Sequence, residues 1–398
     1  MTIDCNCGAL SGIQVLDLSH GIAGPFAARL LGDFGADVIK IEKPGVGDFA
    51  RYLEPRKGQD DDPEQSLLFQ YLNWNKRSVA LDLRSPDVAP IMRRLVERSD
   101  VVIESFRPGK LQSWGLSVDT MLAWNPSVVV TSITNFGQTG PYCQYASGDL
   151  VFQAMSGIMQ ISGRADREPL KHGLNQSLYC AGLNAAYATL AALAAAQADG
   201  QGEHVDLSIH ECLASELVFN QPFYTFLGAV QGRRAVVQDP FDGEPIPARD
   251  GYLAVQAGGG APFEDFADLL QIPELLDPKY ATPARRVAHA EELRTMLVEC
   301  FKNKDPKELF IQGAERRLLL GVVQSAADLL DCEHLRARNF FQRVPHPATG
   351  TMEFPAEIAK LSGTPVAIRR RAPMLNEHQE EVLVSLLGLS QAELAAIA

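Results

Sequence analysis

One carboxylate in this sequence stands where it could take part in a reaction. Asp149 follows Ser147-Gly148 and opens a segment, 149–157, whose residues predict a helix. A side chain at the start of a helix can act on a bound ligand, or it can simply cap the backbone N–H groups of the first turn. The sequence leaves both interpretations of Asp149 open.

A second candidate is the turn Gly21-Ile-Ala-Gly24, between a predicted strand and a predicted helix. A dinucleotide site would read GxGxxG there, but Ala23 fills the position where the backbone must approach a pyrophosphate closely. Glu42, about 20 residues further on, could hold a ribose hydroxyl. Lys43 follows at once, however, and a cation there better suits a phosphate. The turn therefore disfavours NAD, and a plain packing turn is the alternative.

Two further loops follow predicted strands. The first, Phe106-Arg107-Pro108-Gly109-Lys110, offers an aromatic ring and two cations that could stack an adenine and hold phosphates. The second, Gly258-Gly259-Gly260, offers backbone N–H donors that could close over a reacting group. Ligands of open α/β sheets bind at the carboxyl ends of strands, so both loops are well placed. A solvated basic loop and a flexible turn are the alternatives.

The sequence lacks the motifs of serine hydrolases, zinc proteases and P-loop nucleotide hydrolases. The sequence contains no G-x-S-x-G elbow, no H-E-x-x-H pair and no P-loop. His20, His172, His204 and His210 lack the spacing of metal ligands. We therefore expect neither a Ser-His-Asp site nor a metal.

Strand-like and helix-like segments alternate over the first third of the chain. The alternation predicts a parallel sheet covered by helices on both faces, so the expected fold class is α/β. The predicted strands are 13–18, 37–42, 78–83, 100–104 and 127–133, and the predicted helices between them are 26–34, 86–98 and 116–124.

We expect two domains. The large domain takes residues 1–220, and a second, smaller α/β domain takes residues 225–330, because the composition changes from about residue 220 and turn signals follow from residue 239. The segment 335–398 ends in a charged stretch with a leucine stripe, and we expect it to return to the large domain.

The overall composition limits the partners. The chain has 398 residues and a net charge of −13, whereas proteins that bind nucleic acid or anionic membranes are usually basic. No segment approaches about 18 apolar residues without a polar break, and the polar start does not resemble a signal peptide. Seven scattered cysteines are typical of a reduced, cytoplasmic protein. We expect neither nucleic acid nor a membrane as a partner.

Motifs along nearly the whole chain resemble the family III CoA-transferases, the carnitine and formyl-CoA transferase group (CaiB/BaiF). They occur in the family's order and spacing. They are GIQVLDLS at 12–19, AGP at 23–25, LGDFGADVIKIEKP at 31–44, NKRS at 75–78, LDL at 81–83, ESFRPG at 104–109, GQTGPY at 137–142 and APMLNEH at 372–378.

This resemblance implies a Rossmann-like large domain, a small domain on two linkers and a dimer of interlocked rings. It implies no separate cofactor, because coenzyme A (CoA) is itself substrate and product and lies across the strand ends. By the same resemblance the CoA-contacting residues are Lys43 at the nucleotide, Ser105, Phe106, Arg107, Gly109 and Leu111 along the next stretch, and Gly258, Gly259 and Gly260 over the active site.

The resemblance also implies a ping-pong reaction in which an aspartate forms a mixed anhydride and then a thioester with CoA. The family segment has a glycine, five residues ending in that aspartate, three more residues and a glycine. Here 173–182 reads GLNQSLYCAG, so Leu178 stands in the place of the nucleophile. Loss of an essential nucleophile costs on the order of 10⁴–10⁶ in rate. The related racemases add a histidine where this chain has Gly148, so racemisation is not expected.

Three functions remain open. The chain can be the non-catalytic subunit of a hetero-oligomer, as in benzylsuccinate CoA-transferase with its two related subunits, with the aspartate on a paralogous partner. It can be an active enzyme, alone or as a homodimer, that uses another carboxylate, for which Asp149 is the candidate. It can also bind acyl-CoA without catalysis. The expected ligands are an acyl-CoA of the succinyl-CoA kind and a small carboxylic acid, and Phe152, Leu178 and Tyr179 suggest an apolar acyl end.

Overall fold

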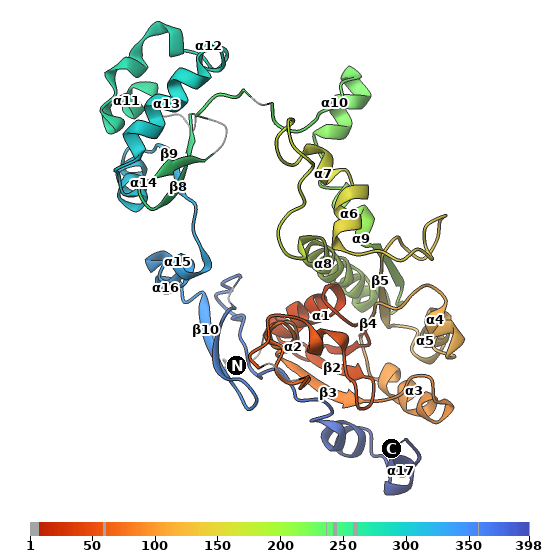
Figure 1. Cartoon of the computed structure of the whole chain (residues 1–398). Coiled ribbons are helices and arrows are strands. Elements are labelled where there is room, and N and C mark those ends of the chain that lie inside the picture. The colour runs from red at the N-terminus through yellow and green to blue at the C-terminus, as the bar shows by residue number, and fades with distance from the viewer. Residues whose placement is uncertain are drawn as a thin grey trace. The chain divides into compact units, whose positions relative to one another are not determined.

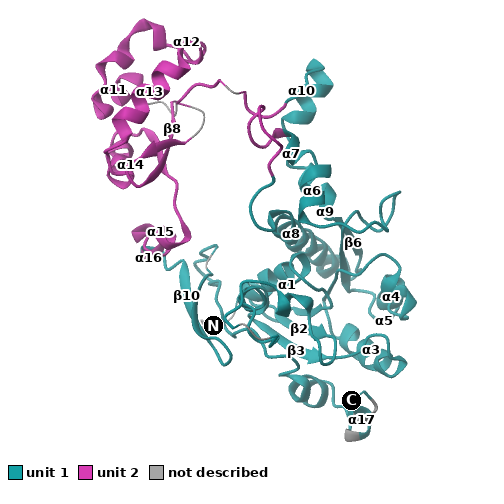
Figure 2. Ribbon diagram, in the orientation of Figure 1, with its two compact units in different colours: residues 1–160, 171–231, 337–398 teal, residues 161–170, 232–336 magenta. Residues whose placement is uncertain are grey.

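The computed structural model describes residues 8–58, 61–235, 237–241, 245–257, 262–356 and 358–397. The chain forms two compact units (Figure 2). The first unit comprises residues 1–160, 171–231 and 337–398, and the second comprises 161–170 and 232–336. Relative to the predicted small domain, 225–330, the second unit begins later, ends later and adds the segment 161–170.

The first unit is built on a six-stranded parallel sheet (Figure 1). The strand order is β3-β2-β1-β4-β5-β6, so it reverses between β1 and β4, as in doubly wound nucleotide-binding sheets. The structure thereby confirms the α/β class. The strands are β1 (Gln14–Asp17), β2 (Asp37–Glu42), β3 (Lys76–Ala80), β4 (Val101–Glu104), β5 (Val129–Thr134) and β6 (His204–Ser208).

Helices cover both faces of this sheet, so successive strand residues enter two different cores: Val15 of β1 packs into one and Leu16 into the other. Helices α1 (Ala23–Asp33) and α8 (Gln176–Asp199) cover the first face. Helices α3 (Ala89–Glu97) and α5 (Val118–Trp124) and the π-helical segment η5 (Glu380–Leu386) cover the second. The unit also contains η1 (Phe49–Tyr52), α2 (Leu67–Asn73), η2 (Pro86–Val88), α4 (Lys110–Ser113), α6 (Asp149–Met155), α7 (Ile158–Ile161), α9 (Ile209–Ala214), α10 (Asn220–Leu227), β10 (Phe341–His346), β11 (Gly350–Pro355) and α17 (Gln391–Ile397).

Helix α8 is long and apolar enough to cross a membrane, judged by length and composition alone. In this fold it is a core helix, with Ala181, Ala185 and Leu193 buried against the sheet. Its contact with α1 is close, because a Cβ on Gly182 would lie 2.7 Å from the carbonyl oxygen of Ala23. This contact fixes the start of α8 beside the turn that follows β1.

The end of the chain packs against the same unit. Val382 and Leu383 of η5 are fully buried in the second core. His378 N donates to Ser78 O at 3.0 Å, and Arg77 Nη1 lies 3.0 Å from Glu381 Oε1. The sheet is therefore covered by segments from both halves of the sequence.

The second unit has a three-stranded antiparallel sheet with its own aromatic core, in which Phe241, Phe266 and Phe301 are buried. Its elements are β7 (Ile246–Ala248), β8 (Gly251–Gln256), α11 (Phe263–Leu270), η3 (Pro273–Leu276), η4 (Pro278–Tyr280), α12 (Pro283–Ala288), α13 (Ala290–Phe301), α14 (Pro306–Glu315), β9 (Leu319–Val322), α15 (Ala326–Leu330) and α16 (Glu333–Ala337). The predicted glycine loop, Gly258 to Gly260, lies outside the described residues.

Candidate functional site

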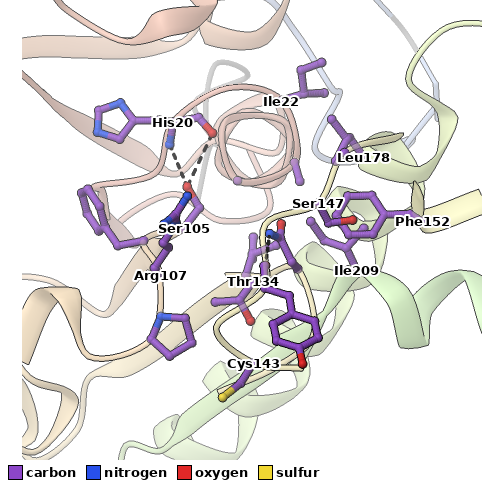
Figure 3. A pocket seen from close by; sticks show the side chains of 18 of the residues that line it. His20, Ile22, Ser105, Arg107, Thr134, Cys143, Ser147, Phe152, Leu178 and Ile209 are labelled. Carbon is purple, nitrogen blue, oxygen red and sulfur yellow. Dashed lines mark hydrogen bonds between the residues drawn. The ribbon is translucent and has the colours of Figure 1, made fainter. Parts of the chain in front are cut away.

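A cavity of about 250 Å³, here called the inner cavity, opens at the carboxyl ends of β1, β4, β5 and β6 (Figure 3). The residues after these strands that line it include His20, Ser105, Asn135 and Ile209. The loops after β1 and β4 are tied together, because His20 N donates to Ser105 Oγ at 2.9 Å. The cavity therefore lies where the strand order reverses, which is the usual ligand site of an open α/β sheet.

The wall of the inner cavity is apolar where α6, α8 and α9 meet it. Ile22, Phe152, Leu178 and Ile209 line this part, and Figure 3 shows the last three near one another. Tyr179, which the sequence analysis placed at the acyl end, does not line the cavity. Among the described residues that line it, there is no aspartate or glutamate.

A second cavity of about 400 Å³, here called the outer cavity, adjoins the inner one and shares His20, Phe49 and Phe106 with it. It lies at the carboxyl ends of β2 and β3. The ring of Phe106 meets Trp114 edge to face at 5.2 Å between centroids. Rings and cations together suit a purine and phosphates. The remaining cationic and aromatic lining consists of Lys43, Arg84, Lys110 and Trp114.

Close packing explains why the turn 21–24 has glycine at both ends. Gly21 has φ +80°, and a Cβ there would lie 2.4 Å from the ring of Phe49. A Cβ on Gly24 would lie 2.3 Å from the Cβ of Ser19. The turn is therefore shaped by its neighbours, and it forms one wall of the inner cavity.

Buried charges hold this turn in place. Asp48 Oδ1 accepts from Gly21 N at 2.8 Å, and Asp48 Oδ2 lies 2.9 Å from Lys40 Nζ. Lys76 Nζ donates to Asp17 Oδ2 at 2.8 Å. Burial on its own would raise the pKa of Asp17, but Lys40 and Lys76 outweigh it and hold that pKa below its usual range. Asp17 thus stays charged at neutral pH, and the buried ion pairs hold the turn through the contact of Asp48 with Gly21 N.

The structure places Asp149 outside both cavities, although Gly148 lines the inner one. Its carboxylate accepts from Lys171 Nζ at 2.9 Å, from Gln153 Nε2 at 3.0 Å and from Ser177 N at 3.2 Å, and also from Ser177 Oγ. Burial opposes ionisation, but Ser177 and Lys171 outweigh it and lower the pKa of Asp149. A carboxylate stabilised on both oxygens is a poor nucleophile. Asp149 instead joins the start of α6 to the start of α8.

This role predicts the effect of Asp149→Asn. We expect the free energy of unfolding to fall by about 1–2 kcal/mol, because an amide cannot replace the charged acceptor for Lys171. We expect CoA affinity to stay close to the wild-type value. Urea denaturation and a CoA titration measure the two quantities, and Asp166→Asn is the matched control at an exposed ion pair with Arg164. If the wild type transfers CoA and the folded Asp149→Asn variant does not, Asp149 would instead be a nucleophile.

The other predicted residues are distributed between the two cavities. Lys43 lines the outer cavity, Ser105 and Arg107 line the inner one, and Phe106 lines both. Two predicted contacts are different: Gly109 (φ +82°) is the N-cap of α4, and Leu111, 7% exposed, lies in the second core and lines neither cavity. Leu111 is buried because the apolar side of α4 faces the sheet.

Several residues that line the cavities were missed from the sequence. Arg84 directly follows the motif at 81–83 and could have been found as a cation just past a strand. Thr134 and Ser147 carry no such signal, because a hydroxyl near a strand end is common. Within the described ranges, no three His, Cys, Asp or Glu side chains gather in a way that could hold a metal ion.

The comparisons with known proteins agree with this geometry. The family model for CoA-transferase family III matches residues 10–379. The succinyl-CoA–D-citramalate CoA-transferase of Chloroflexus aurantiacus is 33% identical over 391 residues, which cover 98% of this chain and 96% of that protein. The alpha and beta subunits of the succinyl-CoA–L-malate CoA-transferase of the same organism are each 31% identical; each match covers 97% of this chain, with 90% of the alpha and 96% of the beta subunit.

A solved structure gives the same result. The crystal structure of a CAIB/BAIF family protein from Brucella suis superposes with a TM-score of 0.85 at 31% sequence identity, covering 96% of this chain and 100% of that one. The similarity in sequence and in structure therefore extends over nearly the full length. This chain belongs to CoA-transferase family III.

Proposed function

We propose that this chain binds an acyl-CoA and acts as the subunit without a nucleophile in a hetero-oligomeric CoA-transferase of the cytoplasm. The proposal depends on the residues at the apolar end of the inner cavity, where the acyl group would lie. Leu178 lies there, at the position that the family resemblance assigns to the aspartate, and no described carboxylate lines the cavity. The aspartate would then come from a paralogous partner.

The arrangement of the two cavities supports acyl-CoA as the ligand. The nucleotide would occupy the outer cavity, where Lys43 and Lys110 can meet its phosphates, beside Arg84, which is paired with Asp82. The pantetheine arm would pass Phe106, which lines both cavities, and bring the thioester towards Leu178. CoA is then substrate and product, and no other cofactor is needed.

The relatives support both the substrates and the subunit role. One relative exchanges CoA between succinyl-CoA and D-citramalate, and another, built from alpha and beta subunits, acts on succinyl-CoA and L-malate. We therefore propose a donor of the succinyl-CoA kind and a small carboxylic acid as acceptor. Both subunits of the malate enzyme resemble this chain, so a pair of paralogues can form one enzyme of this family.

An exposed apolar surface supports a protein partner. The segment 217–232, which contains α10, has no charged residue. Phe219 is 76% exposed and Phe226 is 86% exposed, and no residue of α10 is buried. Soluble monomers rarely expose a contiguous apolar patch of this kind. We propose that a second family III chain covers this patch, as a heterodimer or as an interlocked dimer of two copies.

Reconstitution tests the subunit role. We expect the chain purified with an aspartate-bearing paralogue from the same genome to transfer CoA from succinyl-CoA to a carboxylic acid. We expect replacement of the partner's aspartate by asparagine to abolish this transfer, because no described carboxylate of this chain lines the inner cavity. The formation of new CoA esters, followed by mass spectrometry, is the measurement. Undiminished transfer after that replacement would contradict the division of roles.

A further inference from the structure

Glu104 is a buried carboxyl group that no cation offsets. It is the last residue of β4 and is only 4% exposed. The buried Asp17, by contrast, accepts a hydrogen bond from Lys76 Nζ. Among the described residues no cation forms an ion pair with Glu104, and the charged group that acts on it is Asp206, of the same sign. Acidic side chains are rarely buried without a partner, and those that are often have a function.

The carboxyl group of Glu104 holds the loop after β4. Its Oε2 accepts a hydrogen bond from Phe106 N at 2.7 Å, and Phe106 lines both cavities. The ring of Phe106 meets His20 and Trp114 edge to face, with 5.5 and 5.2 Å between centroids. One backbone N–H therefore links the buried carboxyl group to the side chain at the junction of the two cavities.

A row of polar groups leads from Glu104 to the edge of the sheet. Ser132 lies opposite Glu104 in the register of β4 and β5, and its side chain hydrogen-bonds to the carboxyl group. Ser132 Oγ also lies 3.0 Å from Nε2 of His204, an exposed residue of the edge strand β6. A hydroxyl donates one hydrogen bond and can accept others, and a neutral imidazole can do either. The row can therefore satisfy Glu104 as a carboxylate or as a carboxylic acid.

In the free chain both forms of Glu104 are accessible near neutral pH. Burial raises the pKa of Glu104 from its ordinary 4.5 to about 7, against the opposing effect of Ser132 and of Phe106 N, and the Asp206 carboxylate acts in the same direction as burial. Burial also lowers the pKa of His204, so at neutral pH its imidazole is uncharged and offers no counter-charge.

Bound CoA favours the protonated form. In the proposed complex the ligand excludes water from both cavities and brings its phosphates to the outer one, and both changes disfavour a carboxylate close by. The other charged groups nearby do not compensate: Arg107 and Lys110 follow Glu104 in the same loop without pairing with it, and Asp119 of α5 acts on His204.

We propose that Glu104 positions Phe106 at the junction of the two cavities and takes up a proton from solvent when CoA binds, with Ser132 and His204 satisfying it in both forms. The inference rests on the proposed function, because it requires CoA in the two cavities. Below pH 7 the group is already protonated in the free chain, so the pH has no effect through it. Above pH 7 binding must take up the proton, so the affinity for CoA falls as the pH rises.

Titration of free CoA into the full chain, by calorimetry in buffers of different ionisation enthalpy, counts the protons taken up. The matched variant is Glu104→Gln, whose amide oxygen still accepts from Phe106 N and whose charge is fixed at zero. At pH 8.5 we expect the wild type to take up more protons than this variant and to bind CoA about threefold to tenfold more weakly. At pH 6 we expect equal affinities. Both proteins share His20 and the phosphates of the ligand, so the difference isolates Glu104.

Glu104→Met tests the positioning role, because it keeps the length of the side chain and removes the acceptor for Phe106 N. We expect it to bind CoA about tenfold more weakly at both pH values, with folding checked by urea denaturation. Glu97→Gln, at the exposed pair with Arg93, should keep the wild-type profile. Equal proton uptake by wild type and Glu104→Gln, or undiminished affinity of Glu104→Met at pH 6, would overturn this inference and leave the proposed function standing. A folded wild type that binds no CoA would overturn the proposed function itself.

Discussion

Leu178→Asp is expected to give the isolated chain CoA-transferase activity. In the proposed complex CoA occupies the two cavities, and residue 178 is the third residue of α8, where the helix N-terminus stabilises a negative charge. Losing a nucleophile costs on the order of 10⁴–10⁶ in rate, so regaining one should raise transfer by at least about 10²-fold even with imperfect geometry. We expect part of the variant to carry CoA as a covalent thioester on residue 178 after incubation with succinyl-CoA.

Leu178→Asn is the matched control, because it has the size and polarity of aspartate but cannot form an anhydride. Each variant loses the partial burial of a leucine against the first core, at a cost of about 1–2 kcal/mol. The comparison therefore isolates the carboxylate from the change in packing. Equal transfer by the two variants, or a label on any other residue, would show that position 178 is not the place of the nucleophile.

Arg51→Met is expected to cause the largest loss of stability. Arg51 is fully buried; its Nε lies 2.7 Å from Glu42 Oε2, its Nη1 2.9 Å from Glu64 Oε2, and its Nη2 donates to Pro373 O at 3.2 Å. Removing Arg51 leaves Glu42 buried without its main counter-charge. It also removes the hydrogen bond that joins η1 to the C-terminal segment at Pro373. We expect the free energy of unfolding at pH 7 to fall by about 3–5 kcal/mol, measured by urea denaturation.

The same variant has a defined pH dependence. Burial on its own would raise the pKa of Glu42, but Arg51 outweighs it and lowers that pKa from its ordinary 4.5 to about 2. The ion pair therefore stabilises the fold above pH 4.5, and this stabilisation is lost as the pH falls towards 2. The difference in free energy of unfolding between wild type and Arg51→Met should therefore shrink as the pH falls from 4.5 towards 2. Arg93→Met, at an exposed pair with Glu97, is the control, and an equal loss there would refute the argument.

Most of the parallel sheet could be predicted from the sequence, because its strands are short apolar runs between helical segments. β2 has the predicted bounds, 37–42. β3 does not: it begins at Lys76, where the sequence analysis began the strand at Ser78. Two cations are an unusual start for a buried strand, and Lys76 can be fully buried there because its counter-charge is Asp17, 59 residues earlier in the chain, with Pro25 O and Asn73 Oδ1 as further acceptors. Such a long-range charge pair leaves no local pattern.

The candidate site was predictable to a similar extent. The loop after a predicted strand pointed to Phe106 and Arg107, because the sheet topology brings strand ends together, and the family resemblance added Lys43 and Ser105. The resemblance also placed Leu111 among the CoA contacts, and in the structure this side chain packs into the second core. A sequence motif does not separate the lining of a cavity from the core beneath it. Nor could it find the free hydroxyl of Thr134, since an unpaired group is defined by what surrounds it.

The central claim is that this chain binds acyl-CoA but lacks the group that reacts with it. The most direct measurement incubates the purified wild-type chain alone with succinyl-CoA and several isotope-labelled carboxylic acids, and follows both bound ligand and new CoA esters by mass spectrometry. We predict bound succinyl-CoA with no label in any CoA ester and no covalent CoA on the protein. Labelled CoA esters formed at an enzymatic rate, with Leu178 intact, would contradict the claim.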